Sequence, residues 1–472
     1  MLNPISLDYK IQIPKRLIYL FIIIFTAFLL NFIAYLSILP IFTYVLIYFP
    51  TFFIVFFFSK LSVKNLYTYN LVFLIGVLFS GISAIYVNYL GDESQLYSDA
   101  SSFYEMSSNI NDSSTIQEIQ LIHGGSLAII IWRTFYYIFD FLGFPNDRFI
   151  GIAININNVA LSSIFILKSA IQIYGNISSK IKTLNILLAT CGIFWLFSSI
   201  HLRDSFGLVL ICILIYKWVV FSNNKINFFK VVKLFLFNFI FAIPLFFIRN
   251  DFIMIPLIMA ISSFISMIFN YDYKIKLGKK ILLLLFFLFL SFYMISYFNE
   301  SILHILVNKR DGYSDLALIQ QDSNSLGMRY IVNQPIFIRL IFGSIYLFLF
   351  PIPFWSGFQL ESAYSLFKSF NAIYFYFLTP LFFYSITLLL RRENRKRVII
   401  FLFITSLFFI FSVALTSLET RHFGAFLAPI ILLSLLPDLT IKLHRKRYVL
   451  FLIAFLFVIF ILHISWSIIK YS

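Results

Sequence analysis

Residues 17–36 read LIYLFIIIFTAFLLNFIAYL, a run of twenty residues without a charged side chain. An α-helix rises about 1.5 Å per residue, so about 20 apolar residues cross the roughly 30 Å hydrocarbon core of a membrane. Such runs recur along the whole chain of 472 residues, of which 61% are hydrophobic and only 12% charged. A soluble protein carries about 25% charged residues. The sequence therefore predicts a polytopic membrane protein and excludes a cytosolic enzyme, a fibrous protein and a disordered chain.

The apolar runs predict an all-α transmembrane helix bundle. No linker or internal repeat divides the sequence, so we treat residues 1–472 as a single multi-spanning membrane domain. We expect about 13 spans, at 17–36, 39–59, 67–91, 149–170, 183–200, 205–222, 232–248, 252–271, 281–298, 371–390, 398–417, 423–437 and 448–469. Two further apolar stretches, 126–143 and 336–354, contain charged residues and are ambiguous.

The distribution of charge predicts the orientation of the chain. With the N-terminus in the cytoplasm, the inner loops carry 24 lysines and arginines and four acids, whereas the outer side carries 11 bases and 16 acids. Cytoplasmic loops of membrane proteins are rich in basic residues. A crossing by 336–354 alone would place the basic run 391–397 outside. We therefore expect 126–143 and 336–354 to be interfacial or re-entrant helices on the external face, with two crossings and 15 spans as the alternative.

Two external loops, 92–125 and 299–335, are long, and long loops are usually functional or disordered. The first contains six acids and no basic residue. Carboxylates beside a span can act as a general base for a sugar hydroxyl or bind a divalent cation. Asp99, which aromatic residues flank, is the first candidate and Asp92 the second. The alternative is a solvated acidic loop without a chemical role.

Three outer turns place an arginine beside an acid: 201–204 (HLRD), 249–251 (RND) and 419–422 (ETRH). Topology does not require arginine on the outer side, because basic residues favour the cytoplasm. The planar guanidinium binds phosphate oxygens through two parallel hydrogen bonds. We therefore predict that Arg203, Arg249 and Arg421 bind a phosphate or diphosphate, with Arg329 in reserve. The alternative is that each arginine pairs with its neighbouring acid and only closes its turn.

Other cofactor chemistry has little support in the sequence. His201 and His422 lie next to arginines and could carry protons or donate to phosphate, although a histidine in a turn is more often structural. The sequence contains no Walker A, GxGxxG or CxxC motif, and its two cysteines form no metal pattern. We expect no cofactor, and a divalent cation at the acidic loop is the alternative. The net charge of +16 reflects cytoplasmic loops rather than nucleic-acid binding.

This layout resembles bacterial O-antigen and exopolysaccharide repeat-unit polymerases, the Wzy and EpsG-like group within the wider GT-C-like polytopic glycosyltransferases. The resemblance covers most of the chain in layout but few residues. These residues are the loop acid Asp99, the turns at 201–204 and 249–251, the segment 351–355 (PIPFW) and the Arg421-His422 pair. The acidic loop here follows the third predicted span, whereas in GT-C enzymes it usually follows the first.

The resemblance implies a protein of the bacterial inner membrane that acts on undecaprenyl-diphosphate-linked oligosaccharide at the periplasmic face. The growing glycan would pass from its lipid carrier onto a fresh lipid-linked repeat unit. The expected ligands of the lipid diphosphate are Arg203, Arg249, Arg421, Arg329 and His422. The expected catalytic carboxylates are Asp99, Asp92 and Asp204. Membrane lipid, a chain-length regulator and a flippase are the implied partners.

Two other functions fit the same features. A GT-C-type glycosyltransferase using a polyprenyl-phosphate sugar donor would share the arginines but add one sugar at a time. A non-enzymatic flippase or exporter of lipid-linked glycan would need charged residues along a path through the membrane. The predicted spans hold almost no charge, with Lys217 as the main exception, and this favours the polymerase.

Overall fold

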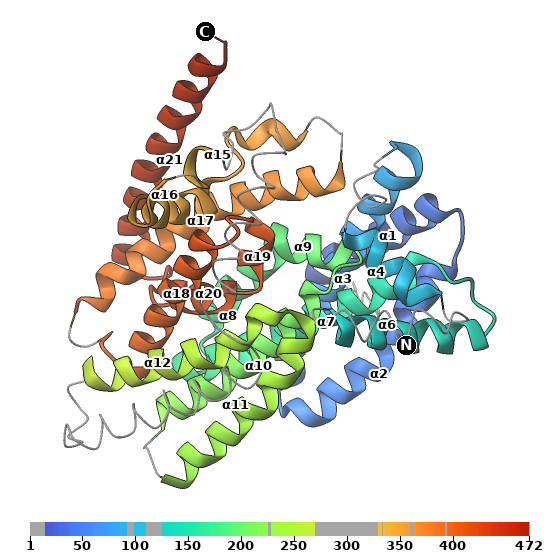
Figure 1. The fold of residues 1–472 in the computed structure, drawn as a ribbon, viewed down its shortest axis with the longest axis horizontal. Coiled ribbons are helices and arrows are strands. Elements are labelled where there is room, and N and C mark those ends of the chain that lie inside the picture. Colours follow the sequence, from blue (N-terminus) through green and yellow to red (C-terminus); the bar gives the residue numbers. More distant parts are fainter. Residues whose placement is uncertain are drawn as a thin grey trace, which may run out of the picture.

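The structure is a computed structural model that describes residues 15–91, 99–109, 125–224, 228–269, 329–332, 334–358, 362–391 and 394–471. Throughout these ranges the regular structure is helical, and no strand occurs (Figure 1). The first half contains α1 (Lys15–Tyr35), α2 (Leu39–Ser59), α3 (Val63–Tyr89), α4 (Asp99–Ser108), α6 (Ser126–Phe141), α7 (Arg148–Tyr174), α8 (Ser178–Ala189), α9 (Gly192–Ser199) and α10 (Asp204–Asn223). The second half contains α11 (Phe228–Ile248), η2 (Asn250–Ile253), α12 (Met254–Phe269), α15 (Arg329–Val332), α16 (Ile336–Leu349), η3 (Phe354–Phe358), α17 (Ala363–Leu389), α18 (Arg397–Leu415), α19 (Thr420–Gly424), α20 (Leu427–Ser434) and α21 (Lys442–Tyr471).

Nine helices in the described ranges are long and apolar enough to cross a membrane, or ten if the bent pair α8 and α9 forms one span. This pattern is compatible with a multi-pass membrane protein, but it does not confirm the expected 13 spans. The predicted span 423–437 is divided into the short helices α19 and α20 by a turn at Ala425 and Phe426. The predicted span 281–298 lies outside the described residues.

The two ambiguous stretches form short helices. Helix α6 has 16 residues and α16 has 14, so each is shorter than the roughly 30 Å hydrocarbon core at about 1.5 Å per residue. One face of α6 is buried through Ile129, Trp132 and Tyr136, while Tyr137 and Phe141 remain exposed. The short length of both helices agrees with helices that lie at the membrane surface, and that location stays a prediction.

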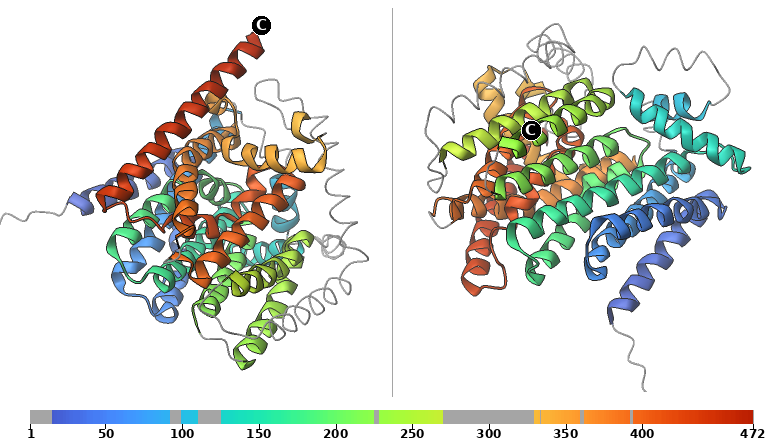
Figure 2. Two further views of the ribbon diagram at one scale, coloured as in Figure 1. Left: turned by 90° about the vertical axis from the view of Figure 1, so that its left-hand side faces the viewer. Right: turned by 90° about the horizontal axis from the view of Figure 1, so that it is seen from below.

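Helix α7 is the centre of the bundle. Within its most apolar stretch 89% of residues are buried, compared with 11% for α21, which lies along the outside and projects beyond the body (Figures 1 and 2). One continuous apolar core runs from Ala27 in α1 to Leu435 after α20. The exposed side chains of α21 are mostly isoleucine, leucine, valine and phenylalanine, which suits a helix facing lipid.

Buried polar side chains fasten the helices to one another. Asn31 in α1 donates to the carbonyls of Ala27 and Val77, and it accepts a hydrogen bond from Tyr44. At the other end of the bundle from the turn at 201–203, Arg397 donates to the carbonyls of Phe221 and Ser222, which end α10. Hydrogen bonds of this kind associate helices where lipid removes the hydrophobic driving force.

The break between α8 and α9 determines where the next turn lies. The two helices meet at 53°, and Asn371 of α17 accepts a hydrogen bond from the backbone N–H of Ile193 in the first turn of α9. A free N–H at a helix start needs such a partner. Helix α9 is therefore anchored to α17 at its beginning, and the turn at residues 200–203 follows directly after its end.

Candidate functional site

Ten polar side chains gather at one end of the bundle, and we call them the polar cluster. They come from α4, from the turns that lead into α10 and η2 and the first residues of those helices, from the beginning of α17, and from Glu419 with α19. The members are Asp99, Arg203, Asp204, Arg249, Asp251, Tyr364, Lys368, Glu419, Arg421 and His422. The cluster includes six of the eight site residues predicted from the sequence. Of the other two, Asp92 and the side chain of Arg329 lie outside the described residues.

The turn that carries Arg203 and Asp204 is held from α7. Asn155 donates to the carbonyls of Ile200 and Leu202, and its own carbonyl oxygen accepts a hydrogen bond from Ser205. All three distances lie between 2.8 and 3.2 Å, and Asn155 is fully buried. A buried amide with both ends bonded fixes the backbone to which the functional side chains are attached.

Arg249 forms a buried ion pair with Asp204. Its Nη1 lies 3.3 Å from the Asp204 carboxylate, and the two side chains are 5% and 4% exposed. Its Nε and Nη2 also reach the two oxygens of Asp251 at 3.3 Å, in the two-pronged geometry of a guanidinium with a carboxylate. The pair of Arg249 and Asp251 agrees with the alternative that an arginine pairs with the acid of its own turn. Asp204, however, pairs with Arg249 of the following turn.

A glycine brings these two turns together. A Cβ atom on Gly207, in the first part of α10, would lie 2.3 Å from the ring of Phe252 in η2. The same ring lies under the guanidinium of Arg249, with 5.2 Å between Cζ and the ring centroid. Because Phe252 is buried and also packs edge-on against Phe426, it has little room to move.

We expect Gly207→Ala to destabilise the protein by about 1–3 kcal/mol, because the added methyl group overpacks the contact with Phe252. Elsewhere in a helix the same change usually stabilises a protein by up to about 1 kcal/mol. A loss of stability in this variant would therefore identify the clash with Phe252. Thermal unfolding of the purified protein in detergent measures the effect. A melting temperature at or above that of the wild type would contradict the packing described above.

Arg203 lies in a partly desolvated position near a second guanidinium and three carboxylates. Its guanidinium lies over the ring of Phe103 in α4, 5.1 Å from the centroid. Burial and the like charge of Arg249 lower the pKa of Arg203, while Asp204, Asp99 and Asp251 act in the opposite direction. Two guanidinium groups close enough to repel each other favour an anion between or beside them.

Arg421 joins helix α4 to the last part of the bundle. Its Nη2 lies 3.2 Å from the carboxylate of Asp99, across 322 residues of sequence. The Asp99 side chain is 57% exposed, whereas Arg421 is 18% exposed. The Nε of Arg421 is buried and has no hydrogen-bond partner among the residues that the structure describes. Burial acts against the charged form, yet Tyr364, Asp204, Glu419 and Asp99 raise the pKa of Arg421.

The sequence did not single out Lys368 and Tyr364. Lys368 forms an ion pair with Glu419 at 3.0 Å, and the hydroxyl of Tyr364 donates to the same carboxylate oxygen. Burial alone would raise the pKa of Glu419, but Lys368, Arg421 and Tyr364 outweigh it and hold this pKa below its ordinary value. The available signal was a lysine on the predicted outer side, three residues before the predicted span 371–390.

The two histidines differ in their surroundings. His201 is buried against Trp132, with the ring centroids 4.0 Å apart, and its Nε2 lies 3.3 Å from the hydroxyl of Tyr136. Burial, followed by the charge of Arg148, lowers the pKa of His201 to about 3, so it is neutral at physiological pH. This favours the structural interpretation of His201. His422 is also buried, and its Nε2 lies 3.4 Å from Nη2 of Arg421.

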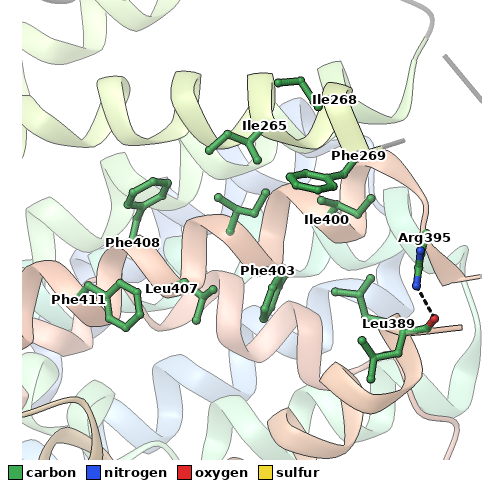
Figure 3. Close-up of a pocket in the computed structure, with 12 residues that line it drawn as sticks. Ile265, Ile268, Phe269, Leu389, Arg395, Ile400, Phe403, Leu407, Phe408 and Phe411 are labelled. Carbon is green, nitrogen blue, oxygen red and sulfur yellow. Dashed lines mark hydrogen bonds between the residues drawn. The ribbon is translucent and has the colours of Figure 1, made fainter. Parts of the chain in front are cut away.

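An apolar groove lies between α12 and α18 (Figure 3). Its volume is about 670 Å³, and its walls include Ile265, Phe269, Phe403 and Phe411. At one end Arg395 donates to the carbonyl of Leu390 at 2.8 Å. Helices α12 and α18 form most of the walls. The beginning of α12 adjoins η2, and the end of α18 leads to α19. The groove and the polar cluster thus share two helices.

The polar cluster offers four basic and four acidic groups at one end of an apolar bundle. Such a site can bind an anionic head group and present a carboxylate to a hydroxyl. Among the described residues, no group of three histidines, cysteines or acids is arranged to hold a metal ion. No protein-family model, curated protein or solved structure matches this chain.

Proposed function

We propose that the protein joins undecaprenyl-diphosphate-linked oligosaccharide repeat units at the periplasmic face of a bacterial inner membrane. The observation that carries this proposal is the convergence of Arg203, Arg249 and Arg421 from three separate turns. A lipid diphosphate needs several fixed cations at the membrane surface, and guanidinium groups suit its oxygens. The resemblance to repeat-unit polymerases of the O-antigen and exopolysaccharide type points the same way.

The resting cluster is electrically balanced, so an anionic substrate must replace some of its carboxylates. The most exposed acids are Asp99 and Asp251, with side chains 57% and 30% exposed, whereas Asp204 is buried at 4%. Exposed ion pairs contribute little free energy and are easily exchanged. In our proposal the diphosphate takes the place of Asp99 beside Arg421, and Asp204 keeps Arg249 in position.

This exchange leaves Asp99 free to act as the general base. The hydroxyl oxygen of the acceptor sugar attacks the anomeric carbon of the donor glycan, and the bond from that carbon to the diphosphate oxygen breaks. The hydroxyl proton passes to Asp99 and then to water, while undecaprenyl diphosphate departs with both bond electrons. Arg203, Arg249 and Arg421 stabilise the negative charge that develops on the leaving group. His422 would assist at the same phosphate oxygens.

The apolar groove supports a place for the lipid chain. A prenyl chain in this groove would lie between α12 and α18 (Figure 3). The beginning of α12 and the end of α18 lead to the turns that carry Arg249 and Arg421. With the polar cluster at the periplasmic face, the N-terminus would lie in the cytoplasm, as the charge distribution predicts. Membrane lipid, a flippase and a chain-length regulator remain the proposed partners, and the mechanism needs no cofactor because the arginines neutralise the diphosphate.

The experiment that tests the function replaces Asp99 with asparagine. We expect the rate of polymer formation to fall by about 100- to 10,000-fold, the usual contribution of a general base. The measurement is the length distribution of lipid-linked glycan in cells or vesicles that contain equal amounts of each variant. Glu105→Gln is the matched control, because Glu105 lies on the same helix and bonds to Ser101 instead of the cluster.

The product pattern separates the candidate functions. Single repeat units without longer species in Asp99→Asn support the polymerase. Loss of a single sugar from each glycan would instead indicate a transferase that uses a polyprenyl-phosphate donor. Absence of all glycan from the outer face would indicate a flippase or exporter. A normal ladder of lengths would contradict a catalytic role for Asp99.

A further inference from the structure

Within the polar cluster, Glu419, Lys368 and Tyr364 form a subgroup beside the arginines. The mechanism proposed above does not use it. Lys368 contacts Glu419 at 3.0 Å, and its ammonium lies over the ring of Tyr364, 4.3 Å from the centroid. Both Lys368 and Tyr364 bond to Oε1 of Glu419. A carboxylate with one oxygen fixed by two donors has a defined orientation.

The second carboxylate oxygen is available to a ligand. Oε2 of Glu419 accepts no hydrogen bond from the residues that the structure describes, and the side chain is 16% exposed. A carboxylate oxygen has acceptor positions that a sugar hydroxyl can use. Because the pKa of Glu419 lies below its ordinary value, the group stays ionised at neutral pH and acts as an acceptor.

The backbone before Glu419 holds an uncommon conformation. Leu418 has a φ of 52°, in the left-handed region that residues other than glycine rarely adopt, and its side chain is fully buried. Outliers of this kind cluster at functional sites, where surrounding packing maintains them. Here the turn places Glu419 two residues before Arg421, and the charges of the two side chains interact, so a ligand bound by Glu419 lies beside a ligand bound by Arg421.

We propose that Glu419, oriented by Lys368 and Tyr364, binds a hydroxyl group of the acceptor sugar and thereby positions it against the diphosphate-linked donor. The inference rests on the proposed polymerase function and adds the acceptor side of the site. Asp99 then accepts the proton of the attacking hydroxyl, while Glu419 accepts a hydrogen bond from a neighbouring hydroxyl of the same sugar. Glu419 therefore contributes to the choice of acceptor and does not itself receive a proton.

The test separates acceptor binding from donor binding in Glu419→Gln. Donor binding is followed by titrating the full-length protein in detergent with undecaprenyl diphosphate. Acceptor use is followed by extension of a fluorescent short-chain analogue of the lipid-linked repeat, with the repeat extracted from host membranes as donor. We expect the acceptor KM to rise about tenfold or more, since a hydrogen bond to a charged group is lost. The affinity for undecaprenyl diphosphate should stay within about twofold.

A second variant guards against loss of folding. Glu419→Asp keeps the charge for Lys368 and shortens the side chain by one methylene, so we expect an intermediate acceptor KM and normal donor affinity. Glu105→Gln is again the control. An unchanged acceptor KM in Glu419→Gln, or an equal loss of donor and acceptor binding, would overturn the acceptor role. Failure of the wild type to bind undecaprenyl diphosphate would instead overturn the proposed function.

Discussion

Lysine in place of Arg203, Arg249 or Arg421 is expected to remove polymer from the cell while single repeat units still reach the outer face. Lysine keeps the positive charge but loses the planar fork that matches two phosphate oxygens. If each arginine stabilises the leaving diphosphate, its replacement lowers the rate of transfer by about 100- to 1000-fold, as for other fixed donors to a developing anion. Gel separation of lipid-linked glycan by length measures the result.

The three variants differ in what else they disturb. Arg421 meets the exposed Asp99 through one nitrogen, so Arg421→Lys tests the phosphate contact with less effect on folding than Arg249→Lys. Arg249 is buried and contacts two acids, so its replacement also affects stability. Arg445→Lys is the control, because Arg445 is exposed in the first turn of α21 and belongs neither to the polar cluster nor to the walls of the groove. A normal ladder in all three cluster variants would contradict phosphate binding by the arginines.

The choice of the arginine turns as candidates for the site had a physical reason. Arginine on the outer side opposes the positive-inside bias, so its repeated appearance indicated a role beyond topology. The same reasoning placed Asp99 outside the membrane. All these residues lie at one end of the described bundle, in agreement with the assumption that their turns share a face.

The contacts between the turns could not be predicted from the sequence. Asp99 lies on α4, which packs on α6, whereas Arg421 lies on α19, which packs on α9 so closely that a Cβ on Gly424 would lie 2.0 Å from Ile193. No local pattern encodes a contact across 322 residues. Lys368 was missed because it lies inside the beginning of a long apolar helix, and its partner Glu419 is distant in sequence.

The predicted span 423–437 shows what hydropathy alone cannot predict about a helix. The run 423–437 is apolar throughout most of its length, which predicted one span. The chain instead turns between α19 and α20, and the backbone N–H of Phe426 bonds to the carbonyl of Phe423. Hydropathy measures whether a segment can lie in lipid, but tertiary packing decides whether it forms one straight helix.

Removal of the Asp204 carboxylate is expected to cost about 3–5 kcal/mol of stability, because Asp204→Ala leaves the buried Arg249 with an uncompensated charge on that side. Asp204 is 4% exposed and Arg249 is 5% exposed, so water cannot readily replace the lost partner. The contact of Arg249 with Asp251 remains, and it places the loss toward the lower end of that range. Thermal unfolding in detergent, compared with the wild type, measures the effect.

A double variant then separates the structural role of this pair from its chemical role. Replacing a buried ion pair with apolar residues of similar size is often neutral or stabilising, so Asp204→Leu with Arg249→Met should recover most of the stability. If Arg249 binds the diphosphate and Asp204 only positions it, the recovered protein remains unable to extend the glycan. Polymer formation by the double variant would show that the pair serves folding alone, and Arg203 and Arg421 would then carry the anion. Loss of polymer together with normal stability assigns the pair to the site, because a defect in folding can no longer account for it.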